Sequence, residues 1–206
     1  MQYLWINPVS AGMCEEDSLK RFLERHGLTR VECRGDWGRI VRERYEASLR
    51  AGVTLADARC PEAVRLLEEI QKEPENESGI ENLKVAPIEP ILLHCARELS
   101  TRPDLADGEK IITTPCQSLA VLGNSLGLEN TRFIAWNRLA IEDSPIPPGY
   151  FAGICRKDGQ AAKVESVSSS EKIRAYVESG SWKQADLLEL LYCKDGCHHG
   201  DGVQTE

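Results

Sequence analysis

The 206-residue chain lacks several features that mark membrane, secreted and nucleic-acid-binding proteins. No apolar run approaches the roughly 18 residues that a membrane helix requires. The first residues have no lysine or arginine ahead of a continuous apolar core, so a secretory signal peptide is not expected. Lysine and arginine total 25 against 33 aspartates and glutamates, which gives a formal net charge of −8. Because phosphate binding needs a concentrated basic surface, this charge argues against nucleic acid as a partner. We expect a cytoplasmic protein without membrane contact.

Cysteine, in contrast, is abundant, with eight residues in the chain. A chain of this length can bury a core without disulfides. Cytoplasmic thiols stay reduced, and grouped cysteines in such proteins are more often metal ligands or catalysts than disulfide partners. The eight thiols are therefore the first candidates for a functional site.

Short apolar segments alternate with segments of helical spacing along most of the chain, which is typical of an α/β fold. The predicted fold has two lobes with mainly parallel sheets flanked by helices. We treat residues 1–206 as one such unit, able to divide into lobes near residues 100–110. The predicted strands cover residues 2–6, 29–33, 53–58, 110–114 and 131–136. The predicted helices cover residues 15–26, 37–49, 61–70, 90–98, 118–126, 171–177 and 182–191.

Two cysteines occupy the same kind of position in this pattern. Cys60 follows the strand predicted at 53–58 and precedes a helix that begins with Pro61. Cys116 follows the strand predicted at 110–114 and precedes the next helix. The carboxyl ends of sheet strands are where α/β proteins build their sites, and a helix N-terminus favours a negative charge such as a thiolate. Both cysteines are therefore candidate ligands.

A second pair lies near the C-terminus, where Cys193 and Cys197 are separated by three residues and followed by glycines. Such spacing allows one metal ion or cluster to bind both thiols, and glycines allow the backbone to approach cluster sulfurs closely. The spacing alone also suits a tetrahedral zinc site completed by His198 or His199, because zinc accepts mixed sulfur and nitrogen ligands.

The other four cysteines give weaker signals. Cys95 shares a predicted helix face with leucine and isoleucine, so we expect it to pack in the core as a small hydrophobe. Cys33 is interpreted as structural in the same way. Cys14 and Cys155 have no partner at an informative spacing and are left unassigned.

Taken in order, these motifs resemble the cluster-binding domain of the iron-only hydrogenases and their non-hydrogenase relatives. The family motif T-S-C-C-P is matched by DARCP at residues 57–61, and P-C-x-x-K-K by PCQSLA at residues 115–120. The motif E-x-M-x-C-x-x-G-C with following glycines is matched by residues 189–202, with the same spacing between the two cysteines. The resemblance implies a [4Fe–4S] cluster bound by four thiols, at Cys60, Cys116, Cys193 and Cys197.

The departures from the family pattern fall at residues that resemble its two-iron pocket. Arg59 stands where the family has its proton-transferring cysteine, Leu119 and Ala120 replace the two motif lysines, and Leu191 replaces the methionine. Arginine stays protonated at neutral pH and leucine donates no hydrogen bond, so hydrogenase activity is not expected. Arg59 is expected instead to offset part of the negative charge of the cluster thiolates.

The sequence therefore favours a short, non-hydrogenase relative that binds one cluster for electron transfer or redox sensing, with a redox partner protein. One alternative is a noncatalytic partner-binding module on the same fold, with zinc or no metal. Another is a catalyst at an open iron site, with Glu89 or His94 as acid or base. The sequence does not indicate the oligomeric state.

Overall fold

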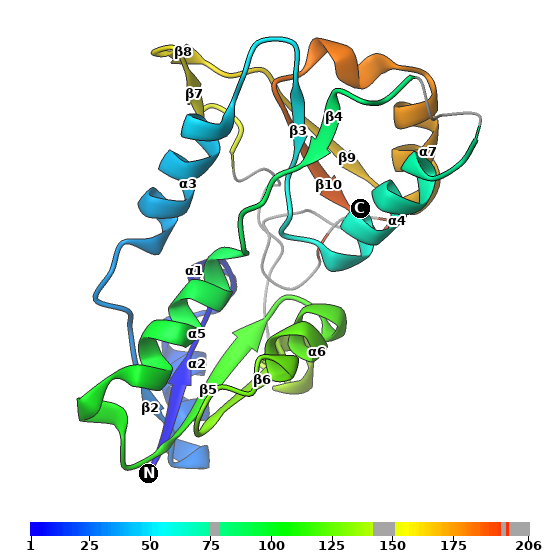
Figure 1. Cartoon of the computed structure of the whole chain (residues 1–206). Helices are drawn as coiled ribbons and strands as arrows, with labels where there is room; N and C mark the ends of the chain where they lie inside the picture. The colour runs from blue at the N-terminus through cyan, green and yellow to red at the C-terminus, as the bar shows by residue number, and fades with distance from the viewer. Residues whose placement is uncertain (75–78, 142–150, 195–196, 198–206) are drawn as a thin grey trace. The chain divides into compact units, whose positions relative to one another are not determined.

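The computed structural model describes residues 1–74, 79–141, 151–194 and 197, which form two compact units (Figure 1). Unit 1 consists of the described residues of Met1–Trp37 and Pro90–Pro148, with Cys197. Unit 2 consists of the described residues of Gly38–Glu89 and Gly149–Gly196. Residues 100–110, where the sequence predicts a lobe boundary, lie inside unit 1.

Unit 1 contains a four-stranded sheet in the order β2-β1-β5-β6, with all neighbouring strands parallel. Its strands are β1 (Gln2–Trp5), β2 (Thr29–Arg30), β5 (Glu109–Thr114) and β6 (Thr131–Ala135). Its helical segments are α1 (Pro8–Gly12), α2 (Glu16–His26), α5 (Ile91–Thr101), η1 (Pro103–Leu105), α6 (Gln117–Ser125) and η2 (Trp136–Arg138). Because parallel strands need crossover connections, helices separate them along the chain.

Both faces of the unit 1 sheet are buried. Tyr3 and Trp5 pack on one face against residues of α5 and α6, while Leu4 packs on the other face with Leu19 of α2. Alternate residues of one strand thus serve two cores, as expected for a parallel sheet covered on both sides. This explains why β1 reads as a continuous apolar run.

Unit 2 repeats this arrangement with the strand order β4-β3-β10-β9, again with parallel neighbours. Its strands are β3 (Thr54–Ala56), β4 (Leu83–Val85), β9 (Val164–Ser168) and β10 (Leu187–Leu191), and a separate antiparallel hairpin is formed by β7 (Arg156–Lys157) and β8 (Gln160–Ala161). Its helical segments are α3 (Trp37–Ser48, from Gly38 onward), α4 (Pro61–Gln71), α7 (Ser170–Glu178) and η3 (Ser181–Gln184). Helices α4 and α7 pack side by side over one face of the sheet (Figure 1).

The predicted helix over residues 182–191 is wrong. The chain there forms the short helix η3, and then β10, a central strand in which all five residues are buried. A strand buried on both faces has no alternation of polar and apolar residues, so the run LLELL could not be distinguished from a helix by its period. Cys193 therefore follows a strand and not a helix.

Other local predictions are confirmed with shifted ends. Gly27 ends α2 with a left-handed φ of 61°, and Pro61 is the first residue of α4.

Some strands differ from the prediction. The strand predicted at 29–33 covers only Thr29–Arg30, and β4 and β9 were not predicted. Among the described residues, no helix is long and apolar enough to cross a membrane.

Candidate functional site

Cys60 and Cys116 are the N-cap residues of α4 and α6, each at the carboxyl end of a parallel strand. The Cys60 carbonyl accepts a hydrogen bond from the Val64 N–H (3.0 Å), and the Cys116 carbonyl accepts one from the Ala120 N–H (3.2 Å). Neither thiol makes a capping hydrogen bond to its helix. Each thiol is thus presented at a helix N-terminus, where the N–H groups and the helix dipole favour negative charge.

Cys193 lies just after β10, the strand that pairs with β3. Its backbone is held in place because the Ser169 N–H, at the end of β9, donates to the Cys193 carbonyl (2.9 Å). Cys60 and Cys193 therefore follow neighbouring strands at the same edge of the unit 2 sheet. Cys116 belongs to unit 1, as does Cys197, which is half-buried.

A buried ionic network fixes the turn between β3 and α4. The Arg59 guanidinium donates from Nε to Asp57 Oδ2 (2.7 Å) and from Nη2 to Glu189 Oε1 (2.9 Å). The Arg59 backbone N–H also donates to Asp57 Oδ1 (2.7 Å). Asp57 and Glu189 are each 1% exposed. The side chain that precedes Cys60 is therefore bound on two sides by carboxylates.

Aromatic residues and further donors complete this network. The Arg59 guanidinium lies over the Phe151 ring, 5.1 Å from its centroid. The Phe151 N–H and the Ser166 hydroxyl donate to the two oxygens of Glu189 (2.9 and 2.7 Å). The Tyr45 hydroxyl accepts a hydrogen bond from the Ala58 N–H (3.1 Å). The buried charges of the network are thus met by polar contacts from several elements, as buried charges require.

Burial raises the pKa of Asp57 above its ordinary value, and the neighbouring Arg59 charge and its hydrogen bonds oppose this shift. The expectation that Arg59 offsets the charge of cluster thiolates is not supported. Its single positive charge already forms ion pairs with two buried carboxylates, at distances of 2.7 and 2.9 Å. Arg59 therefore holds the turn between β3 and α4 in place through these two ion pairs.

The residues at the other family positions are also packed in the protein. Leu119 and Ala120, where the family has lysines, are 3% and 1% exposed and belong to the core of unit 1. Leu191, at the methionine position, is 7% exposed at the end of β10. These side chains present methyl groups where the family pattern has polar or sulfur-containing ones.

Among the described residues, no three histidine, cysteine, aspartate or glutamate side chains are grouped so as to hold a metal ion. His198 and His199, the nitrogen ligands of the zinc alternative, lie outside the described residues. His94 is buried and stacks on Trp37, with ring centroids 5.2 Å apart. Glu89 is half-buried in unit 2. His94 therefore belongs to the core of unit 1, whereas the alternative required an acid or base at an open site.

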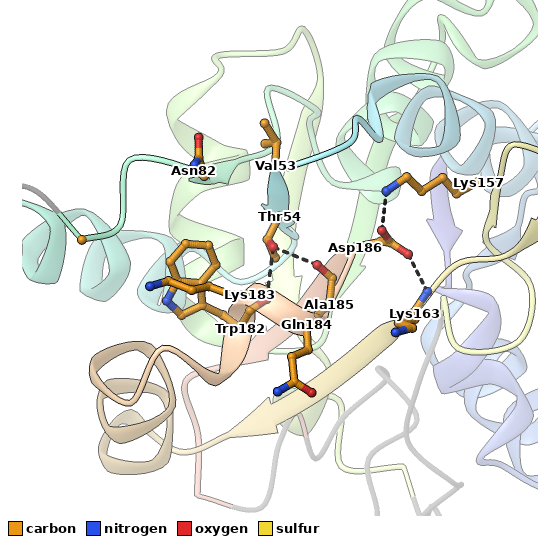
Figure 2. Close-up of a pocket in the computed structure, with 12 residues that line it drawn as sticks. Val53, Thr54, Asn82, Lys157, Lys163, Trp182, Lys183, Gln184, Ala185 and Asp186 are labelled. Carbon is orange, nitrogen blue, oxygen red and sulfur yellow. Dashed lines mark hydrogen bonds and ion pairs between the residues drawn. The ribbon is translucent and has the colours of Figure 1, made fainter.

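Figure 2 shows a pocket in unit 2, with a volume of about 370 Å³. It surrounds the amino ends of the strands. Cys60 lies beyond the other end of β3. Lys157 forms an ion pair with Asp186, and the Thr54 hydroxyl lies 2.8 Å from the Ala185 carbonyl. Burial opposes the ionisation of Asp186, but the hydrogen bond from Lys157 and the Lys163 N–H hold its pKa below the usual value. These contacts connect the amino ends of β3, β9 and β10.

Sequence reasoning missed Asp57 and Glu189. Glu189 interrupts an otherwise apolar run, and an acidic residue buried in such a strand requires a partner. The sequence therefore held one signal of the buried network: a glutamate inside an apolar strand, and Arg59 after another strand. The partner itself could not be identified, because β3 and β10 are far apart in the sequence and their pairing is a property of the fold.

The sequence matches no family model and no curated protein. Solved structures do match. The chain is similar to [FeFe]-hydrogenase HydA in a structure that concerns stepwise H-cluster assembly, with a TM-score of 0.51 and 11% identity. It is also similar to a single-residue variant of [FeFe]-hydrogenase HydA1 from Chlamydomonas reinhardtii, with a TM-score of 0.52 and 11% identity. Each match covers 100% of this chain and 80% of the other.

At this level of identity the similarity concerns the fold alone. The shared feature is the arrangement of parallel sheets flanked by helices. The predicted fold class is confirmed, and the chain has an α/β fold like that of the [FeFe]-hydrogenases.

Proposed function

We propose that this chain binds a [4Fe–4S] cluster through Cys60, Cys116, Cys193 and Cys197 and that it functions in electron transfer or redox sensing. The observation that carries the proposal is the repeated placement of a cysteine directly after a parallel strand and at the N-cap of a helix, in a chain with the fold of the [FeFe]-hydrogenases. Cys193 follows the strand next to that of Cys60.

The donor set fits such a group. Four thiolates are the usual ligands of a [4Fe–4S] cluster, and when bound it supplies one-electron oxidation and reduction. Cys60 and Cys116 are half-buried and Cys193 is exposed, so none of the three is enclosed in a core. Helix N-termini at Cys60 and Cys116 favour the negative charge that the thiolates carry.

The same turn argues against hydrogen turnover. Arg59 occupies the position of the family's proton-transferring cysteine, and its guanidinium is held by Asp57 and Glu189. A guanidinium does not release a proton near neutral pH, so it cannot relay one. Leu119 and Ala120 pack in the core and offer no ammonium group to a second iron unit. We therefore expect a redox partner protein, and not hydrogen, as the source or acceptor of electrons.

The test is anaerobic reconstitution with iron and sulfide, followed by iron and acid-labile sulfide counting and EPR of the reduced protein. We expect about four irons and four sulfides per chain and a reducible cluster signal. Cys60→Ser, Cys193→Ser and Cys197→Ser are each expected to lose most of the iron, because a hydroxyl replaces a ligand thiolate. Cys95→Ser is the matched control and is expected to keep it, because Cys95 is buried in the core of unit 1.

Zinc in place of iron, or no metal with all eight thiols titratable, would contradict the proposal and would favour the noncatalytic partner-binding module. Equal iron in the Cys95→Ser and Cys197→Ser variants would show that the ligand assignment is wrong. A hydrogen-evolution assay of the reconstituted protein with a strong reductant is expected to give no turnover. Clear turnover would overturn the role given to Arg59.

A further inference from the structure

Cys33 and Cys95, which the cluster proposal does not use, lie against each other inside unit 1. The Cys33 thiol donates a weak hydrogen bond to the Cys95 carbonyl, with a sulfur–oxygen distance of 3.9 Å. The neighbouring Cys33 thiol and burial together raise the pKa of the Cys95 thiol. Cys95 is 4% exposed and Cys33 is half-buried. One thiol of the pair is thus accessible and the other is shielded.

The segment that carries Cys33 is held firmly on α5, the helix that carries Cys95. The Glu98 carboxylate of α5 accepts hydrogen bonds from the Arg34 N–H (2.6 Å), the Gly35 N–H (3.1 Å) and the Trp37 indole N–H (2.7 Å). The Arg102 guanidinium donates to the carbonyl of Glu32 (2.6 Å). Residues on both sides of Cys33 are therefore fixed to the end of α5, which keeps the two thiols together without a covalent bond.

The pair also has a distinctive place in the chain. The chain passes from unit 1 into unit 2 between Trp37 and Gly38, and it returns at Pro90, directly before α5. Cys33 thus lies on the segment that leads out of unit 1, and Cys95 on the helix that follows the return. Trp37 stacks on His94 between these two segments, with an interplanar angle of 11°. A bond between the thiols would join the unit 1 ends of both connections.

We propose that Cys33 and Cys95 form a reversible disulfide that covalently ties these two connecting segments. With a small disulfide as oxidant, the Cys33 thiolate attacks one sulfur, forms a mixed disulfide and releases one thiol. Cys95 then loses its proton, attacks the Cys33 sulfur and releases the second thiol. Two protein thiols are oxidised and one disulfide is reduced to two thiols. The second step is the slower one, because burial opposes loss of the Cys95 proton.

This proposal does not depend on the cluster, because neither cysteine is a proposed ligand. It differs from ordinary core packing in a way that can be measured. Core packing requires only that the two side chains fill space, whereas a disulfide requires that the sulfurs approach to about 2.05 Å. The bond also closes a long loop, which restricts the unfolded chain.

The experiment treats the full-length, reduced protein with oxidised glutathione, blocks the remaining thiols and maps tryptic peptides without reduction. Cleavage after arginine and lysine yields residues 31–34 and 85–97, each with a single cysteine. We expect these two peptides to be recovered as one linked species that dithiothreitol separates. The oxidised protein is also expected to unfold at a higher midpoint temperature than the reduced protein.

Cys33→Ser is expected to remove both the linked species and the rise in midpoint temperature. Cys155→Ser changes a cysteine that is 1% exposed in unit 2, and it is expected to keep both. The proposal is overturned if Cys33 and Cys95 are recovered as blocked thiols while other cysteines have reacted. Recovery of either one joined only to glutathione or to a different cysteine also overturns it.

Discussion

In unit 1 the turn that carries Cys116 is held by neutral groups, whereas in unit 2 the turn that carries Cys60 is held by charged ones. The Thr114 hydroxyl donates to the Cys116 carbonyl (2.8 Å), and the Thr113 hydroxyl accepts from the Asn7 N–H (3.0 Å). At the matching place in unit 2, Arg59 is bound by two buried carboxylates. Both turns place a cysteine at the N-cap of a helix, but different forces fix the two turns.

This difference determines how much stability a substitution in each turn is expected to remove. A buried ion pair contributes little net stability compared with apolar packing, but removal of one partner is costly because the other charge stays buried. A neutral hydroxyl contributes one ordinary hydrogen bond, and its loss costs much less. The charged turn of unit 2 is therefore expected to be the more sensitive of the two, and substitutions can test this directly.

The largest effect is expected from Arg59→Ala. The substitution leaves Asp57 and Glu189 buried without their cation, so the free energy of unfolding should fall by about 3–5 kcal/mol. Urea unfolding followed by circular dichroism measures this change. Arg65→Ala is the control, since the Arg65 side chain is 65% exposed and its ion pair with Glu62 should contribute less than about 1 kcal/mol. Equal losses in both variants would refute the importance of the buried network.

The next effect concerns how closely α6 packs on the sheet of unit 1. A Cβ at Gly123 would come within 2.3 Å of the Phe133 ring, so Gly123→Ala must displace α6 or the ring. Overpacking of this kind costs about 1–3 kcal/mol, which denaturant unfolding can measure. Gly12→Ala is the control, because nothing lies within 4 Å of its Cβ. A Gly123→Ala protein as stable as the wild type would show that the α6–β6 contact is not tight.

These contacts show where sequence reasoning succeeded and where it stopped. The α/β pattern, the strand-end cysteines and the Pro61 and Gly27 helix ends could be predicted, because local spacing and backbone preferences determine them. Strand β10 was mistaken for a helix because burial on both faces removes the alternation that identifies a strand. The partners of Arg59 could not be predicted, because they depend on the pairing of β3 with β10.

The third effect depends on pH and concerns Glu98 in unit 1. Burial opposes the ionisation of Glu98, but hydrogen bonds from the Arg34 N–H, the Trp37 indole and the Gly35 N–H hold its pKa below the ordinary value of 4.5. A lowered pKa in the folded state adds stability above about pH 4.5, and this stability is lost as the pH falls through the folded-state pKa.

Glu98→Gln should therefore reduce the free energy of unfolding by about 1.5 kcal/mol or more at pH 7, since the amide oxygen accepts only neutral hydrogen bonds and the amide NH₂ group cannot accept at all. The difference from the wild type should shrink as the pH falls below 4.5. Unfolding measured across this pH range gives the slope, and a difference that is constant with pH would contradict the assignment.

The smallest effect is expected from Thr113→Val, the counterpart in unit 1 of the change at Arg59. Valine keeps the shape of the fully buried Thr113 side chain but removes the acceptor for the Asn7 N–H, so stability should fall by about 1 kcal/mol. Thr131→Val is the control, because its hydroxyl makes an exposed contact with the Glu129 carbonyl at the start of β6. If Thr113→Val instead cost as much as Arg59→Ala, the neutral turn would be as sensitive as the charged one. The two turns would then differ in the kind of contact that holds them, but not in how much those contacts contribute to stability.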